Sequence, residues 1–350
     1  MKCTRKFTGN KRQKSTVYQP PYSITQEILR LVSDIGELVG RVSLTAESRL
    51  TPQLRRQNRI KSIHGSLGIE QNTLSVEQIT AVIAGKRVIG KPREIQEARN
   101  AFVAYETLPQ WTPADVNDLL NAHKIMMRSL SDDAGTFRQG GVGVFNGKQV
   151  IHLAPPAQRV PELMSNLLTW VRTTKEHPLI VSAVFHYELE FIHPFSDGNG
   201  RLGRLWQTLI LSGWKPWLAY IPVESVIRER QTDYYEALKK SDWQAQSTPF
   251  LEFILEALRY TIESAAATEQ VTEQVTEQVV SLLKALGEGA MTAAGIMSEF
   301  QLRHRPNFMY TYIKPALAAG LIELTQPGSP RSPTQRYRLA AKGRQRIISF

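Results

Sequence analysis

A tight junction between two helical patterns constrains the fold of this chain more than any other stretch. The first pattern, PLIVSAVFHYELEFI, has to end before Pro194, because proline interrupts a helix and disfavours helical backbone in the residue before it. A second helical pattern, GRLGRLWQTLILSG, begins soon afterwards at Gly200. The stretch HPFSDGN between them, residues 193–199, is therefore a short loop that joins two helices.

Most other segments also carry the spacing of amphipathic helices. In SITQEILRLVSDIGELVGRV, apolar side chains recur every three or four positions, and Ser23 with Gln26 suits a capping box. The exception is VGVFNGKQVIHL, residues 142–153, where alternating apolar residues flank Asn146-Gly147, a pair typical of a type I′ turn. The sequence therefore predicts a mainly α-helical fold with an inserted β-hairpin, for which an irregular loop is the alternative.

The last part of the chain predicts a second module. The repeat TEQVTEQVTEQV places valines in a slowly drifting stripe and favours a linker helix. Two short helical patterns follow, and then LIEL and RYRLA as a strand pair, which is the order of a winged helix. A winged helix can bind DNA, or it can dock on a protein as a basic module. The residues expected to face DNA are Arg303, His304, Arg305, Asn307 and Tyr310 in a recognition helix, with Arg331 and Arg336 beside the wing.

The net charge of +11 is concentrated at the two ends of the chain. Residues 1–20 carry six Lys/Arg and no acid, and residues 290–350 carry nine Lys/Arg against two Glu, so the middle is near neutral. No apolar run approaches the roughly 18 residues that span a bilayer, and the basic start lacks the apolar stretch of a secretory signal. The single cysteine, Cys3, excludes a disulfide framework within one chain. These features predict a cytoplasmic protein without membrane partners.

The loop residues form a set that suits phosphate. Gly198 and Gly200 leave backbone N–H groups unshielded at a helix start, where the helix dipole favours an anion. Arg201 and Arg204 lie on one helical face and can fork onto phosphate oxygens. Asp197 is the only acid of the loop, which predicts a protein ligand for a Mg²⁺ ion that keeps most of its shell as water and phosphate.

Two further loop residues complete the chemistry. Asn199 can add a neutral hydrogen bond to the same phosphate oxygens. Histidine has an ordinary pKa of about 6.5, so His193 can accept a proton from a hydroxyl, a role worth roughly 10²–10⁴ in rate. Together these residues describe the attack of a hydroxyl on a phosphorus atom of a magnesium-bound nucleotide. The alternative, a glycine-rich turn with a salt-bridged arginine pair, explains the glycines alone.

HPFSDGNGRLGR, residues 193–204, resembles the signature of the Fic family, His-Pro-Phe-x-Asp-Gly-Asn-Gly-Arg-x-x-Arg, at every fixed position. The segments NRIKSIHGSLGIEQNTLS and FRQGGVGVFNGKQVIHLAPP are also similar to bacterial Fic proteins with a C-terminal winged helix, so the resemblance covers nearly the whole chain. It implies a helical Fic fold and the transfer of AMP from ATP, with Mg²⁺, to a Ser, Thr or Tyr hydroxyl of a protein. The site residues that it implies are His193 as base, Asp197 as Mg²⁺ ligand, and Gly198, Asn199, Gly200, Arg201, Leu202, Gly203 and Arg204 around the ATP phosphates.

The resemblance implies further roles outside this signature. The hairpin of residues 142–153 would be a flap that holds the target segment as an added strand. Related proteins line the adenine and ribose with the segment that corresponds to VIRERQTDYYEAL, which implies Arg230, Tyr234 and Tyr235. Arg230 stands where a polar Asn is expected. Packing and surface charge are the alternative for these three residues.

SLGIEQN, residues 66–72, resembles a regulatory helix of such family members, Ser/Thr-x-x-x-Glu-Gly/Asn. Ser66 and Glu70 match it, and Gln71 departs from its last position. In the family this glutamate pairs with the second arginine of the signature, here Arg204, and denies the γ-phosphate its partner. A charge-assisted pair worth about 1.5–3 kcal/mol can compete with one phosphate contact. A solvated helix residue is the alternative for Glu70.

The sequence thus predicts a protein adenylyltransferase that is autoinhibited by Glu70. A bifunctional enzyme that also removes AMP and a non-catalytic, nucleotide-sensing DNA-binding regulator stay open, as does a homodimer. Transfer of phosphate or phosphocholine is disfavoured, because the loop is unaltered near Asn199 and Arg201. The expected parts are a basic disordered tail (1–20), an N-terminal helical region with the inhibitory helix (21–105), a Fic catalytic core (106–262), a linker helix (263–282) and a winged-helix domain (283–350).

Overall fold

The computed structural model describes residues 18–49, 51–141, 143–146, 149–287, 289–302, 304–318, 320–329, 332, 334–341 and 343–344. The chain divides into two compact units, with the division between Glu263 and Ser264. The finer domain boundaries given above remain predictions, and residues 1–17 of the expected tail lie outside the described residues. In the part of the chain that is described, no helix combines the length and the apolar composition needed to cross a bilayer.

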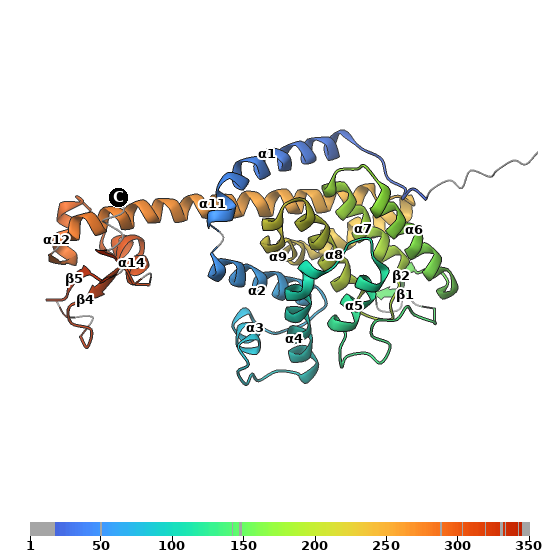
Figure 1. Ribbon diagram of the computed structural model, residues 1–350, viewed down its shortest axis with the longest axis horizontal. Coiled ribbons are helices and arrows are strands. Elements are labelled where there is room, and N and C mark those ends of the chain that lie inside the picture. Colours follow the sequence, from blue (N-terminus) through green and yellow to red (C-terminus); the bar gives the residue numbers. More distant parts are fainter. Residues whose placement is uncertain are drawn as a thin grey trace, which may run out of the picture. The chain divides into compact units, whose positions relative to one another are not determined.

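The first unit is built of helices and one hairpin (Figure 1). Its elements are α1 (Gln26–Arg49), α2 (Pro52–Ile69), α3 (Val76–Ile83), α4 (Pro92–Thr107), η1 (Leu108–Gln110), α5 (Val116–Met126), β1 (Gly143–Asn146), β2 (Gln149–Leu153), η2 (Ala157–Arg159), α6 (Val160–Thr173), α7 (Pro178–Ile192), α8 (Asn199–Trp214), η3 (Pro216–Tyr220), α9 (Val223–Glu229), α10 (Gln231–Gln244) and the first part of α11 (Thr248–Leu286). The predicted mainly α-helical fold is confirmed.

The predicted loop between two helices joins α7 to α8, which lie side by side (Figure 1). Pro178 opens α7, where its missing N–H costs nothing, and α7 stops one residue before His193. Almost every residue of α7 is buried, as is most of α8, with Phe185 and Trp206 fully inside. The pair is therefore the core of the first unit, and it holds the loop at its end.

Two local predictions are corrected. The first helix starts at Gln26 rather than with a Ser23 cap, because Thr25 Oγ1 accepts from the Ile28 N–H at 3.1 Å while the Ser23 N–H donates to Thr248 Oγ1 at 2.9 Å. The hairpin is confirmed as an antiparallel pair, but its register pairs Asn146 with Gln149. Its connection is therefore residues 147–148, which lie outside the described residues, and not Asn146-Gly147.

The second unit contains the predicted strand pair. LIEL and RYRLA supply β4 and β5, and a third strand, β3, which the sequence analysis did not predict, pairs with β5 on its other side. The buried core of the second unit includes Leu282, Ile296, Ile313 and Leu339. The elements after α11 are β3 (Ala290–Thr292), α12 (Ala293–Glu299), α13 (Arg305–Phe308), the π-helix η4 (Met309–Ile313), α14 (Lys314–Ala318), β4 (Ile322–Leu324) and β5 (Arg336–Leu339).

The residues expected to face DNA are only partly described. Arg303 and Arg331 lie outside the described residues. His304 caps α13, because its Nδ1 accepts from the Asn307 N–H at 3.2 Å. Tyr310 is 73% exposed. DNA binding by this unit remains a prediction.

Residues 18–23 run as an extended strap along the first unit. The Ser247 N–H donates to the Pro21 carbonyl at 2.8 Å, and the Tyr18 hydroxyl donates to Glu188 Oε2 of α7 at 2.8 Å. Tyr18 falls inside the predicted tail of residues 1–20, yet it is fixed to the core. Burial raises the pKa of the Glu188 carboxyl to about 7, although the hydrogen bond from Tyr18 lowers it in part.

Glu188→Gln is expected to change how stability depends on pH. Between about pH 4.5 and pH 7 the folded protein keeps a proton that the unfolded chain has lost, so the free energy of unfolding falls as the pH rises through this window. The variant has no ionisable carboxyl at this position. Between pH 5 and pH 8 its free energy of unfolding should therefore rise by about 2 kcal/mol relative to that of the wild type. Urea denaturation followed by tryptophan fluorescence measures it, because all six tryptophans lie in the first unit. Glu162→Gln, at an exposed position, is the control. A free energy of unfolding that depends on pH in Glu188→Gln as it does in the wild type would contradict the prediction.

Candidate active site

The structure places His193 at the end of α7 in an uncommon backbone conformation. Its φ is 49°, and its N–H donates to the Leu189 carbonyl at 2.9 Å. The His193 carbonyl accepts from Arg138 Nε at 2.7 Å, and Arg138 Nη1 donates to the Gly140 carbonyl at 2.7 Å. Arg138 is only 2% exposed, so one buried guanidinium ties the loop to the segment that leads into the hairpin. Arg138 was not predicted from the sequence.

Asn199 closes the loop on itself. Its Oδ1 accepts from the Phe195 N–H at 3.0 Å, and its Nδ2 donates to the Phe195 carbonyl at 2.9 Å. Both polar groups of the buried amide are thereby used within the loop. In this structure Asn199 shapes the backbone of the loop, and its contact with phosphate remains a prediction.

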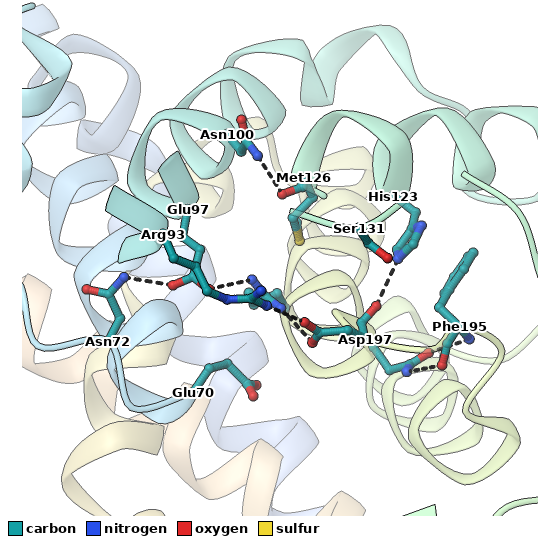
Figure 2. Close-up of polar contacts among 12 residues, drawn as sticks. Glu70, Asn72, Arg93, Glu97, Asn100, His123, Met126, Ser131, Phe195 and Asp197 are labelled. Carbon is teal, nitrogen blue, oxygen red and sulfur yellow. Dashed lines mark hydrogen bonds and ion pairs between the residues drawn. The ribbon is translucent and has the colours of Figure 1, made fainter. Parts of the chain in front are cut away.

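His123 of α5 supports the other side of the loop, as Figure 2 shows. Its ring stacks on Phe195 with centroids 3.7 Å apart. The Gly135 N–H donates to Nδ1 at 2.9 Å, so Nε2 carries the proton and donates to the Asp197 carbonyl at 2.9 Å. Burial lowers the pKa of His123, which agrees with a neutral ring. No periodicity in the sequence marks this histidine.

The start of α8 has the properties of an anion site. Gly198, its N-cap, has a φ of 88° and offers no side chain to cap the first turn, so backbone N–H groups point outward. A Cβ atom at Gly200 would lie 2.5 Å from Glu70 Oε1, which shows how closely a carboxylate approaches this turn. Among the described residues, no acceptor reaches the buried Nε of Arg201. Leu202 and Gly203 are buried in α8, and Gly203 makes room for the His186 ring.

Arg204 is the most deeply buried charge of the site. It is 1% exposed, donates from Nε to Ser66 Oγ at 3.0 Å and from Nη2 to the Ser66 carbonyl at 3.1 Å, and forms an ion pair with Glu70 Oε1 at 2.7 Å. Burial by itself would lower the pKa of Arg204, but the attraction of Glu70 raises it overall. The structure therefore brings the two ends of the predicted regulatory pair together.

The backbone after α2 sets the position of the Glu70 carboxylate. The Gln71 N–H donates to the Gly68 carbonyl and the Asn72 N–H to the Leu67 carbonyl, each at 3.1 Å, which are the two bonds of a Schellman motif. Gln71 accordingly has a φ of 66°. This left-handed conformation favours glycine or asparagine, the residues that the family resemblance expects there.

Of the three residues predicted around adenine and ribose, the two tyrosines pack together and Arg230 has different partners. Tyr234 is buried, and its hydroxyl contacts His186 Nε2 at 3.2 Å, while Tyr235 packs edge-on against Tyr234. Arg230 instead forms ion pairs with Asp233 and Glu256. It lines an acidic cavity of about 360 Å³ whose lining includes no residue of the 193–204 loop.

Asp197 offers a carboxylate that fits a magnesium ion of the predicted kind. Its side chain is 43% exposed at the edge of the anion site. No cluster of three or more acidic, histidine or cysteine ligands occurs among the described residues, so an ion here would take most of its ligands from phosphate and water. The unpartnered buried donor of Arg201 also fits a bound phosphate.

These features define a loop with the properties of an anion site between two buried helices, with a histidine beside it. The family model of the Fic/DOC family matches residues 113–211, and that of the Fic-like C-terminal domain matches residues 277–340. The crystal structure of a Fic family protein from Desulfovibrio desulfuricans G20 is 57% identical, covers 93% of this chain and 99% of its own, and has a TM-score of 0.72. The chain belongs to the Fic family.

More distant relatives carry a named activity. A protein adenylyltransferase Fic of Culex quinquefasciatus is 27% identical over 241 residues, which is 64% of this chain and 45% of that protein. One from Aedes aegypti is 26% identical over the same length. The chain therefore spans about half the length of these curated relatives. Fic-1 of Caenorhabditis elegans, at 22% identity and a TM-score of 0.54, shares the fold.

Gln71→Gly is expected to stabilise the first unit. Glycine adopts the left-handed conformation without the steric clash of a Cβ atom. The relief of this clash exceeds the larger loss of chain entropy of glycine on folding by about 0.5–1 kcal/mol. Urea denaturation followed by tryptophan fluorescence should show this increase. Gln301→Gly is the matched control, because Gln301 also has a positive φ, 54°, but lies in the second unit, which has no tryptophan. A lower free energy of unfolding of the first unit in Gln71→Gly would contradict the conclusion that the backbone at this position favours glycine.

Proposed function

We propose that this chain is a protein adenylyltransferase that transfers AMP from ATP to a hydroxyl of a target protein. The convergence of the uncapped start of α8 with Arg201 and Arg204 at one end of α7 carries the proposal, because these groups suit a polyphosphate. The complete signature and the names of the curated relatives support it. Asp197 would hold Mg²⁺, which supplies charge neutralisation at the phosphates.

His193 is proposed as the general base. Its Nδ1 lies 3.4 Å from the Glu190 carbonyl, which favours the proton on Nδ1 and leaves Nε2 to accept. The target hydroxyl gives its proton to His193 as its oxygen attacks the α-phosphorus. The new bond joins that oxygen to phosphorus, the bond to the β-phosphate oxygen breaks, and pyrophosphate leaves. The donors around the loop stabilise the charge that develops.

Glu70 is proposed as the group that restrains this reaction. Its carboxylate occupies the Arg204 guanidinium at 2.7 Å and approaches the first turn of α8 beside Gly200. A phosphate oxygen would seek the same donors, so the carboxylate and the nucleotide compete for them. The hairpin of residues 142–153 is proposed to present the target segment, by pairing with it as a strand. A DNA or protein partner for the second unit and a homodimer remain predictions.

Labelled ATP tests the proposed reaction. The purified chain is incubated with Mg²⁺, a cell lysate and ATP labelled at either the α- or the γ-phosphate. Retention of label on protein from the α position alone supports AMP transfer. Retention from the γ position would indicate phosphate transfer. Nucleotide binding without a labelled product, in Glu70→Gly as well as in wild type, would favour the non-catalytic nucleotide sensor.

His193→Ala is expected to remove the general base. AMP transfer should fall by about 10²–10⁴, and ATP affinity should change less than about twofold, because the imidazole contacts the nucleophile rather than the nucleotide. Both quantities are measured in a Glu70→Gly background, by single-turnover transfer and by calorimetry. Undiminished transfer in the double variant would overturn the mechanism.

Glu70→Gly is expected to raise AMP transfer, including self-modification, at least about tenfold, which requires only about 1.4 kcal/mol of inhibition from the ion pair. The comparison with wild type uses α-labelled ATP at equal protein concentration. Glu77→Gly, a change at an exposed glutamate of α3, is the matched control. No increase in a folded Glu70→Gly protein would exclude Glu70 as the inhibitor, and a loss of AMP removal would assign Glu70 to the reverse reaction.

A further inference from the structure

Both carboxylate oxygens of Asp197 are held by guanidinium groups. Arg201 Nη2 donates to Oδ1 at 2.8 Å, and Arg93 Nη2 donates to Oδ2 at 2.8 Å. Arg201 belongs to the signature, but Arg93 comes from the first turn of α4 and is separated from Asp197 by 104 residues. Figure 2 shows Arg93 reaching across to the loop from the helix that carries Glu97. The carboxylate that would hold Mg²⁺ is therefore already paired on both sides.

Arg93 is itself held in this position by Glu97. The Arg93 Nε lies 3.3 Å from Glu97 Oε1, and the Arg201 Nη1 lies 3.6 Å from the same oxygen. The other oxygen of Glu97 accepts from Asn72 Nδ2 at 2.9 Å, and Asn72 also donates to the Glu94 carbonyl at 3.2 Å. Glu97 therefore connects the segment after Glu70 with the guanidinium groups that hold Asp197.

We propose that Arg93 is a positioning residue that competes with the metal ion for Asp197 and so sets the Mg²⁺ concentration at which nucleotide binds. The inference rests on the proposed function, which requires Mg²⁺ and ATP at this loop. A magnesium ion binds a carboxylate oxygen at about 2.0–2.1 Å in near-octahedral geometry. A guanidinium that donates to the same oxygen stands within a few ångströms of that ion, and the two positive charges repel. While Arg93 holds Oδ2, it therefore weakens the binding of the metal at Asp197.

The strength of this competition follows from exposure. The side chains of Arg93 and Asp197 are 55% and 43% exposed. Solvent therefore screens the pair, and its interaction free energy is that of a surface ion pair. Removal of Arg93 should therefore shift the metal requirement by about two- to fivefold, and not by orders of magnitude. Arg201 can turn to a phosphate when nucleotide enters, because it belongs to the anion site. Arg93 stands outside the signature and holds Oδ2 from a separate helix.

The test measures metal-dependent nucleotide binding and requires no turnover. Calorimetric titration of α,β-methylene-ATP, which cannot transfer AMP, is carried out across a range of Mg²⁺ concentrations. The parent is Glu70→Gly, in which the competing carboxylate is gone, and Arg93→Ala, Arg93→Lys and Arg99→Ala are each added to it. Arg99 is the matched control, since it is an exposed arginine of the same helix. Circular dichroism checks that each variant is folded.

Arg93→Ala is expected to lower the half-saturating Mg²⁺ concentration about two- to fivefold, Arg93→Lys to lower it less, and Arg99→Ala to leave it unchanged. Binding of the analogue without Mg²⁺ should stay within about twofold of the parent. An unchanged or higher Mg²⁺ requirement in Arg93→Ala overturns the proposal, and weaker metal-free binding would make Arg93 a phosphate ligand instead. If no variant binds the analogue at any Mg²⁺ concentration, the proposed function fails and this inference fails with it.

Discussion

The contact between the Arg204 guanidinium and the end of α2 determines the organisation of the site. A guanidinium that is 1% exposed has to be paired with an anion, because burying an unpaired charge is costly. Ser66 and Glu70 satisfy it in this structure. The same requirement can be met by a polyphosphate that approaches the uncapped first turn of α8. The two arrangements would satisfy the same buried charge, and the proposed competition between the Glu70 carboxylate and a nucleotide phosphate rests on this requirement.

The loop itself is held by residues that do not touch that charge. Asn199 forms hydrogen bonds with the Phe195 backbone inside the loop, and the His123 ring on α5 donates to the Asp197 carbonyl. Arg138 donates to the His193 carbonyl. These contacts fix the backbone, so that the charged side chains alone are left to rearrange. The contacts that hold the backbone are thus separate from those of the charged side chains. This arrangement suits a site in which the base and the anion-binding backbone keep their geometry while the arginines exchange partners.

Much of this architecture is predictable from the sequence, for local reasons. Pro194 and the glycines define the loop because they act on their own backbone, and the alternation around Asn146 defines the hairpin. The resemblance to a known signature indicated Glu70 and Arg204 as partners across 134 residues. His123, Arg138 and Arg93 were not predicted, because each contacts the loop from an element distant in sequence and no periodicity marks a residue with a single long-range partner. The shift of the hairpin connection by one residue reflects strand register, which turn type and loop length set and the alternation of apolar residues alone does not.

The position of Glu70 on the same chain as Arg204 gives the restraint a property that a separate inhibitor would lack. A tethered carboxylate acts at an effective concentration fixed by the length and stiffness of its connection, often in the millimolar range or above. Its occupancy of the guanidinium is therefore independent of how much protein is present, and in the proposed competition it depends on the free nucleotide concentration and on the rigidity of the tether. The Schellman bonds at Gln71 and Asn72 supply much of that rigidity. In the proposed function, the backbone cap of one helix thus contributes to the nucleotide concentration at which the site responds.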